Sequence, residues 1–256
     1  MTFVLIAVFG LIWGSFLNVV IYRLPRGLSL VRPPSACPGC GTRIKPYDNV
    51  PVLSYLWLRG KCRKCGRPIS PVYPAVEALT ALAFVLVFLR SGRLLGLEFV
   101  AGCLFASALI ALGFIDYFHQ ILPDSITMPG LVLALAYSFF RDDLSFRGAL
   151  VGAAAGAGFL LLVYGAYRLI RKREGLGMGD VTMLLMIGAY LGLARTLLTL
   201  ILASFVGALV GVFFIVGRKK DLQFALPFGT FLAPAAFVAA LWGERIVNAY
   251  LGLYRR

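Results

Sequence analysis

The sequence predicts an all-α polytopic membrane protein, with about eight transmembrane helices and one small polar insert after the first of them. Of its 256 residues, 60% are hydrophobic and 14% are charged. Water-soluble domains hold roughly 45–50% apolar and about 25% charged residues. The apolar residues form long continuous runs, and a membrane helix needs about 20 such residues. Strands of a membrane barrel would alternate apolar and polar residues, so these runs exclude that fold.

Eight runs are long and apolar enough, or nearly so, to cross the hydrocarbon core of a bilayer. They are residues 2–21, 75–89, 94–115, 121–140, 148–167, 181–194, 196–217 and 222–242. The runs 75–89 and 181–194 are short, and we expect flanking residues to extend them or the bilayer to thin around them. The sequence therefore divides into a first transmembrane helix (1–25), a polar insert (26–74) and a second transmembrane domain (75–256).

The positive charge indicates how the chain lies in the membrane. Lys and Arg together number 25, against 11 acidic residues, an excess that in a soluble protein would suggest a nucleic-acid partner. Here 17 of the 25 fall between Arg23 and Pro74 and in the connections near Arg171 and Lys219, and eight fall on the other side. Basic residues collect on the cytoplasmic side of a membrane. We therefore expect a cytosolic insert, both termini outside, a lipid bilayer as partner and no nucleic acid.

The insert contains two Cys-x-x-Cys pairs, Cys37 with Cys40 and Cys62 with Cys65. Two such pairs at this spacing supply the four thiolates of a tetrahedral structural Zn²⁺ site and leave no open position for catalysis. The metal would replace the hydrophobic core that so short a segment cannot build. The alternatives are four unliganded thiols and a thioredoxin-like redox pair, although no βαβ pattern surrounds either pair. Cys103 lies in an apolar run and is expected to be a small buried side chain.

Two aspartates, Asp116 and Asp180, lie at the ends of predicted spans. Two complete spans separate them, so both carboxyl groups are expected at the cytoplasmic face of the membrane. Carboxyl groups within hydrogen-bond range share one proton, and such a pair can activate water and polarise a peptide carbonyl, as in an aspartic protease. Gly177 and Gly179 are expected to give backbone freedom and let a substrate strand approach. The alternative is that Asp180 only caps its helix and Asp116 only ends one.

Several short motifs follow one another in order along nearly the whole chain, in addition to the two cysteine pairs. They are 14–25 (GSFLNVVIYRLP), 49–55 (NVPVLSY), 58–62 (LRGKC), 68–77 (PISPVYPAVE), the stretch from 115–116 (ID) to 122–124 (LPD), and 177–180 (GMGD). With these motifs the chain resembles the bacterial prepilin peptidases, the type 4 prepilin leader peptidase/N-methyltransferases.

The resemblance implies an aspartic peptidase of the GxGD type with Asp116 and Asp180 as its catalytic pair. It implies removal of a short basic leader from prepilins or pseudopilins, usually after Gly, on the cytoplasmic side of the bacterial inner membrane. These substrates belong to type IV pili and type II secretion. It also implies methylation of the new N-terminus, often Phe, by S-adenosylmethionine. Glu77 and Asn18 are candidates to line the methyl-donor site, and the alternative is that they are simple interfacial polar residues.

Two other functions stay open on the sequence alone. The chain could be a peptidase that does not methylate. It could also be a zinc-stabilised membrane scaffold or transporter whose paired acids bind protons or cations. A transporter would favour acids near the bilayer midplane and inverted repeats. The acids here lie at span ends, and the sequence shows no convincing internal repeat.

Overall fold

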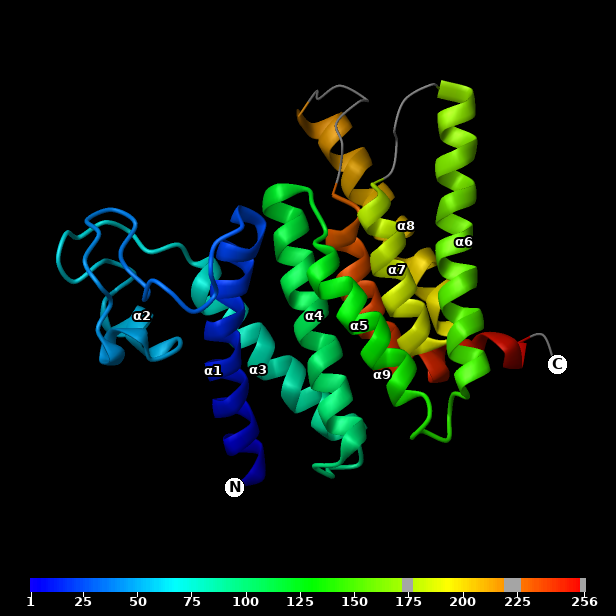
Figure 1. The fold of residues 1–256 in the computed structure, drawn as a ribbon, viewed down its shortest axis with the longest axis horizontal. Coiled ribbons are helices and arrows are strands. Elements are labelled where there is room, and N and C mark those ends of the chain that lie inside the picture. Colours follow the sequence, from blue (N-terminus) through cyan, green and yellow to red (C-terminus); the bar gives the residue numbers. More distant parts are fainter. Residues whose placement is uncertain (172–176, 219–226, 254–256) are drawn as a thin grey trace. The chain divides into compact units, whose positions relative to one another are not determined.

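The computed structural model describes residues 1–171, 177–218 and 227–253, and its regular structure is helical (Figure 1). The helices are α1 (Thr2–Arg23), η1 (Leu24–Arg26), η2 (Pro46–Asn49), α2 (Leu53–Trp57), α3 (Val72–Arg90), α4 (Leu97–His119), α5 (Asp124–Tyr137), α6 (Phe146–Arg171), α7 (Met178–Leu191), α8 (Leu193–Arg218) and α9 (Gly229–Leu253). Within the described residues, β-pairing is limited to two isolated bridges in the insert. The expected all-α membrane fold is confirmed.

Within those ranges, six helices have the length and composition to cross a membrane: α1, α3, α4, α6, α8 and α9. Two apolar helices, α5 and α7, are shorter. The short run 75–89 is extended by flanking residues, because α3 covers Val72–Arg90. The run 121–140 yields the shorter α5, because Pro123 precedes the helix in an extended conformation. The run 222–242 lies partly outside the described residues, and α9 begins at Gly229.

The last of the short runs, 181–194, is divided between two helices. Gly192 follows α7 with a φ of 74°, a conformation that suits glycine and ends helices. α8 then starts at Leu193. The most apolar 18-residue stretch of α8 has a mean hydropathy of 2.5, and only 17% of that stretch is buried inside the protein. An apolar helix that the protein does not cover is suited to face lipid.

The chain forms two compact units, Met1–Ala111 and Leu112–Arg256, with the division inside α4. In the first unit, α1 packs along α3. Gly10 and Gly14 lie four residues apart on α1, and a Cβ on Gly14 would stand 2.6 Å from the Cα of Glu77. Small residues at this spacing let two membrane helices approach closely. The Trp13 indole nitrogen also donates a hydrogen bond to the hydroxyl of Ser107 on α4, at 2.9 Å.

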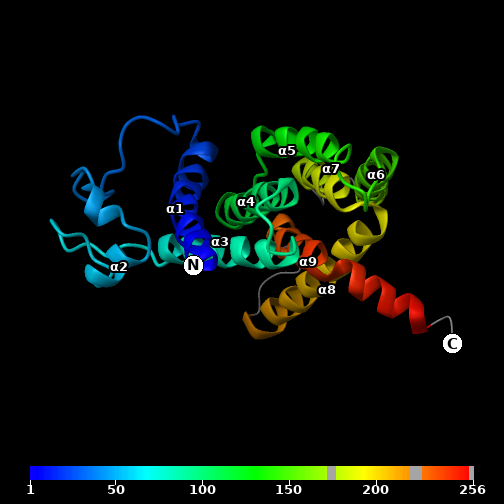
Figure 2. The same ribbon diagram turned by 90° about the horizontal axis from the view of Figure 1, so that it is seen from below.

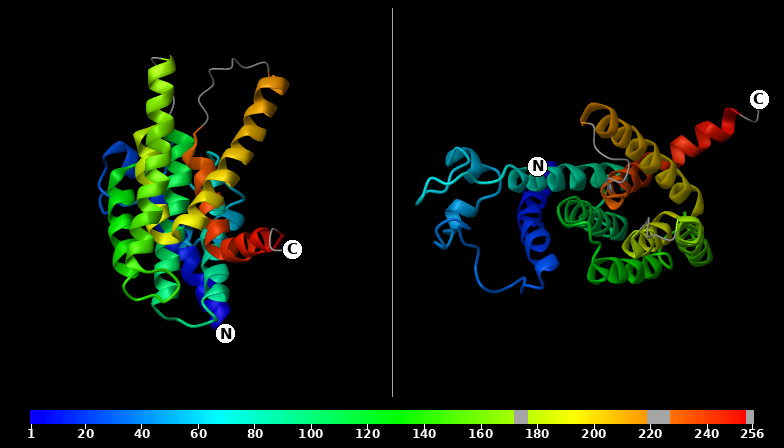
Figure 3. Two further views of the ribbon diagram at one scale, coloured as in Figure 1. Left: turned by 90° about the vertical axis from the view of Figure 1, so that its right-hand side faces the viewer. Right: turned by 90° about the horizontal axis from the view of Figure 1, so that it is seen from above.

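In the second unit, α7 is largely buried. It packs against α5, α6, α8 and α9, and α5, α6 and α7 lie side by side (Figure 2). α8 also packs against α9 (Figure 3). At the crossing of α6 and α7, a Cβ on Gly188 would stand 2.3 Å from the carbonyl oxygen of Gly152. Because neighbouring helices cover α7, its 14 residues need not match the thickness of the bilayer.

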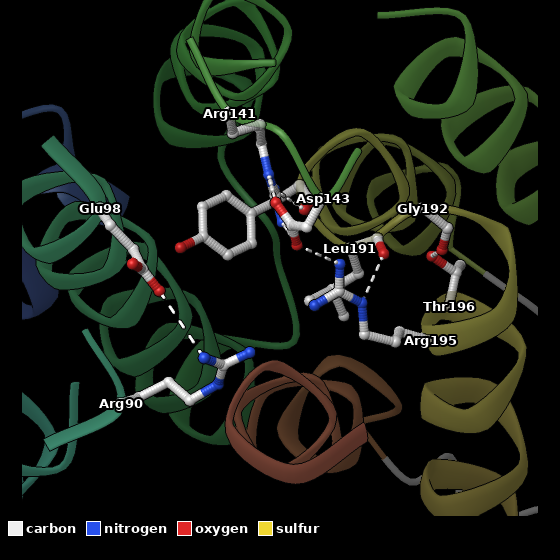
Figure 4. A network of polar contacts seen from close by, with 9 residues as sticks. Arg90, Glu98, Arg141, Asp143, Leu191, Gly192, Arg195 and Thr196 are labelled. Atoms are coloured by element: carbon white, nitrogen blue, oxygen red, sulfur yellow. Dashed lines mark hydrogen bonds and ion pairs between the residues drawn. The ribbon is translucent and has the colours of Figure 1, made fainter. Parts of the chain in front are cut away.

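A network of cations fixes the C-terminal end of α7 (Figure 4). Arg141 donates to the carbonyl oxygen of Tyr190 at 2.7 Å, and Arg195 donates to that of Leu191 at 2.9 Å. Both arginines also bind Asp143 in the connection between α5 and α6. Hydrogen bonds from Arg141 lower the pKa of the Asp143 carboxyl to about 2, and Arg195 adds to the effect. The last carbonyls of a helix favour such cations.

Candidate active site and metal centre

The second unit brings Asp116 and Asp180 together. Asp116 lies near the C-terminal end of α4 and is 5% exposed, while Asp180 lies in the first turn of α7 and is 7% exposed. The charge of Asp116 acts on the Asp180 carboxyl, and the backbone N–H of Gly229 faces both groups. The ends of three helices, α4, α7 and α9, therefore converge on one pair of buried carboxyl groups.

Asp116 is held by the first turn of α9. The backbone N–H of Thr230 donates to Asp116 Oδ2 at 2.8 Å, and the Thr230 hydroxyl lies 3.2 Å from the same oxygen. A helix N-terminus carries unpaired N–H groups and a partial positive charge, so it stabilises a carboxylate placed there. Thr230 and Gly229 were not expected from the sequence. The available signal was the start of an apolar helix after Pro227, which gives no hint of a partner 114 residues away.

Asp180 uses one oxygen locally and leaves the other free. Its Oδ2 accepts a hydrogen bond from the backbone N–H of Gly177 at 3.2 Å, so the capping alternative holds for that oxygen. Its Oδ1 is buried and has no hydrogen-bond partner among the described residues. A buried polar atom without a partner is costly and needs an explanation. Helix capping alone does not provide one.

The two glycines before Asp180 differ from their expected roles. Gly177 has a φ of −76° and a ψ of 141°, a backbone conformation that any residue adopts. A Cβ on Gly179 would stand 2.8 Å from the Cβ of Leu122. The space at Gly179 is therefore used by the protein's own chain. A Cβ on Gly229 would lie 3.0 Å from Asp116 Oδ2, so the absence of a side chain there lets α9 reach the acid pair.

In the first unit, the four cysteines of the insert form one cluster. The Sγ atoms of Cys37, Cys40, Cys62 and Cys65 all lie within 4.8 Å of one another. Four thiolates at about 2.3 Å from a tetrahedral Zn²⁺ stand about 3.8 Å apart, and the Sγ atoms of Cys37 and Cys65 are 3.8 Å apart. The cluster can hold a metal ion, and its donor set fits zinc. Cys103 is buried in α4, as expected.

The two halves of this cluster share one backbone pattern. In each half, the N–H of the first cysteine donates to a carbonyl five residues later, at 2.9 Å for Cys37 and 2.8 Å for Cys62. The glycine after the second cysteine then donates to the carbonyl of the first, and Gly41 and Gly66 have φ values of 66° and 69°. Only glycine adopts that conformation readily. The residues are thus prearranged in two matching turns that direct their sulfurs to one point.

Glu77 and Asn18 are both buried in the first unit, each 8% exposed. The Asn18 side-chain nitrogen donates to the carbonyl oxygen of Tyr73 at 3.0 Å. The Glu77 carboxylate accepts a hydrogen bond from the backbone N–H of Val52 at 2.7 Å. Asn18 therefore contacts the start of α3, and Glu77 contacts the insert.

Comparison with known proteins identifies the family. A family model described as Bacterial Peptidase A24 N-terminal domain matches residues 8–91, and one described as Type IV leader peptidase family matches residues 103–212. Relatives named prepilin leader peptidase/N-methyltransferase include those of Aeromonas hydrophila (39% identical over 97% of this chain and 93% of the relative), Pseudomonas putida (40%, 97% and 93%) and Pseudomonas aeruginosa (39%, 94% and 91%). No solved structure matches the chain. The chain therefore belongs to the type IV leader peptidase family.

Proposed function

We propose that this chain is a membrane aspartic endopeptidase that removes the short basic leader of type IV prepilin-like proteins after Gly and then N-methylates the new N-terminal residue. Family membership supports both activities, since relatives that align over nearly the whole chain are named for both. The observation that carries the peptidase is the buried pair of Asp116 and Asp180, with one oxygen of Asp180 unpartnered.

The proposed proteolysis follows from the chemistry of two adjacent buried acids. Two buried carboxyl groups whose charges act on each other do not readily both ionise, so in this proposal the pair holds one proton. The ionised member takes a proton from a water molecule as that water attacks the peptide carbonyl. The protonated member donates a hydrogen bond to the carbonyl oxygen. Asp116 is held by Thr230, and Asp180 is held by Gly177, so both acids are oriented before the substrate arrives.

In the insert, Cys37, Cys40, Cys62 and Cys65 would hold a structural Zn²⁺. The spacing of the sulfurs and the two matching turns support this assignment. A bound zinc would supply folding energy to a segment with little core of its own. In this proposal, the insert and the acid pair lie on the cytoplasmic side of the bacterial inner membrane, and the 17 basic residues expected on that side support this orientation.

The proposed methyl donor is S-adenosylmethionine, whose sulfonium group supplies an activated methyl group. Its support is the N-methyltransferase activity in the names of the relatives. The proposed substrates are prepilins of type IV pili and pseudopilins of type II secretion.

Mass spectrometry of a co-expressed prepilin tests both activities. We expect a leaderless product whose N-terminal residue is heavier by one CH₂ group. A leaderless product without the added mass would reduce the proposal to a peptidase. An intact leader would point to the scaffold or transporter instead. Asp116→Asn should leave the leader attached, whereas Asp142→Asn, which changes an exposed acid in the connection between α5 and α6, should not.

A further inference from the structure

Glu77 is a buried acid without a counter-charge. It lies in the second turn of α3 and is 8% exposed. Its carboxylate interacts with the backbone N–H of Val52 and with the Ser15 side chain. No Lys or Arg in the described part of the chain forms an ion pair with it. A buried carboxylate with no cation is unfavourable, and an acid inside a membrane helix indicates a function by default.

The backbone that Glu77 holds is strained. Leu53 donates a hydrogen bond to the carbonyl oxygen of Pro51 at 2.6 Å, which closes a three-residue turn around Val52. Val52 has a φ of 60° and a ψ of −49°. This is the rare, strained form of the γ-turn, and a β-branched residue with positive φ is an outlier. Such strain persists where the surrounding structure enforces it and is concentrated at functional sites.

The same point is enclosed by α1. A Cβ on Gly14 would stand 2.6 Å from the Cα of Glu77, so the backbone of α1 lies directly against α3 there. Ser15 follows on α1, and Asn18 is one turn further on and bonded to Tyr73. Three separate segments, α1, α3 and the turn at Val52, thus surround one carboxylate with polar groups and a strained backbone. All of them belong to the first unit.

We propose that the Glu77 carboxylate binds the α-ammonium group of the cleaved substrate and accepts its proton before methyl transfer. The inference rests on the proposed N-methylation and adds a substrate-binding base to it. An ammonium group supplies the missing positive charge and offers three N–H donors to the Glu77 carboxylate and the Ser15 hydroxyl. A sulfonium group offers the charge but no N–H donor.

The proposed methyl transfer takes three steps. The α-ammonium gives one proton to Glu77 and becomes a neutral amine with a free electron pair. That pair forms a bond to the methyl carbon of S-adenosylmethionine, while the carbon–sulfur bond breaks and its electrons stay on sulfur. The product is a secondary ammonium and a thioether. Glu77 then releases its proton to water.

The test uses purified full-length protein, labelled S-adenosylmethionine and a peptide that begins at the mature N-terminus, so that no leader needs to be removed. Glu77→Gln keeps an acceptor for the Val52 N–H but cannot take a proton. We expect its methylation rate near pH 7 to fall by at least about 100-fold, within the range for a lost general base. Between about pH 7 and pH 9 the rate should recover about tenfold, because the α-ammonium group of the free peptide loses its proton to solution near pH 8. Glu77→Asp should restore part of the rate near pH 7.

The matched control is Thr80→Ala. Thr80 is fully buried one turn further along α3, next to Gly14, and among the described residues its hydroxyl bonds only its own helix backbone at Val76. This control should methylate at the wild-type rate. Binding of labelled S-adenosylmethionine, measured by equilibrium dialysis, should be the same in wild type and Glu77→Gln.

Three results would overturn the inference. They are wild-type methylation by Glu77→Gln, a loss without recovery at high pH, and a loss of S-adenosylmethionine binding, which would make a cationic group of S-adenosylmethionine, its sulfonium or its own α-ammonium, the cation that Glu77 receives. If the wild-type protein itself fails to methylate the peptide, the proposed methyl transfer fails with it. That result is distinct from a failure confined to Glu77.

Discussion

The two units bury their acids in different ways. In the second unit, Asp116 and Asp180 lie together, and each is held by backbone N–H groups at a helix end. In the first unit, the single carboxylate of Glu77 accepts a hydrogen bond from the strained turn at Val52. A pair of acids can keep one proton between them, whereas a single buried carboxyl group is stabilised either by keeping its own proton or by a cation from outside. The same type of side chain is thus suited to water activation in one unit and to binding an ammonium group in the other.

A fourth acid shows what a structural carboxylate looks like in this molecule. Asp143 is half exposed and bound by both Arg141 and Arg195, so its charge is already balanced. Neither Asp180 nor Glu77 has such a partner within the described residues. The comparison therefore contrasts one ion-paired, half-exposed acid with two buried acids that have no cation among the described residues.

The variant expected to have the largest effect, Asp180→Asn, should lose one activity and keep the other. Asp180→Asn should reduce leader removal by at least about 10³-fold, because a lost acid or base costs roughly 10²–10⁴-fold. The same protein should still methylate a peptide that begins at the mature N-terminus. Both rates can be measured by mass spectrometry on one preparation. Loss of both rates together would contradict the assignment of separate reactions to the acids of the two units.

Removing one sulfur from the insert should also have a large effect. Cys62→Ser should be purified without metal, because it leaves only three of the four thiolates that the proposed structural Zn²⁺ requires. Metal content of the purified protein, measured by inductively coupled plasma mass spectrometry, checks this. Cys103→Ala, which removes the buried cysteine of α4, should retain the metal. A metal-free wild type would contradict the assignment of the cluster.

Two glycines at close helix contacts, one in each unit, test whether the packing of each unit supports its own activity. A Cβ on Gly14 would stand 2.6 Å from Glu77, and one on Gly188 would stand 2.3 Å from Gly152. Gly14→Ala should impair methylation and Gly188→Ala should impair leader removal. Each should destabilise its own unit by about 1–3 kcal/mol. Thermal unfolding measures the stability. Gly158→Ala, where α6 has open space, should be neutral or stabilising, and an equal loss there would point to a general sensitivity to substitution.

The smallest expected effect concerns Asp143. Its folded pKa of about 2 lies below the ordinary value of 3.8, so its contribution is present above pH 4 and is lost as the pH falls towards 2. Because the side chain is 50% exposed, solvent screening limits that contribution to about 1 kcal/mol. Asp143→Asn should lower the free energy of unfolding by this amount at neutral pH and change it little near pH 2. An equal difference at both pH values would contradict the ionic origin.

Much of this architecture can be predicted from the sequence, because it depends on local patterns. Apolar runs predict the helices, and the Cys-x-x-Cys spacing predicts the sulfur cluster. The two spans between Asp116 and Asp180 predict that both lie at the same face of the membrane. The rest depends on contacts between distant segments. The hydrogen bond from the Thr230 N–H to Asp116 connects residues 114 positions apart. The strain at Val52 arises from the fold around it, and no residue pattern predicts a valine with positive φ.

We propose that Asp116 and Asp180 act as one site that holds a single proton. The most direct test is the rate of leader removal in Asp116→Asn, Asp180→Asn and the double variant, measured on one purified prepilin. Residues that act as a unit lose their effect together, so the double variant should be no slower than either single variant. Losses that multiply in the double variant would show two independent contributions and would contradict the shared site.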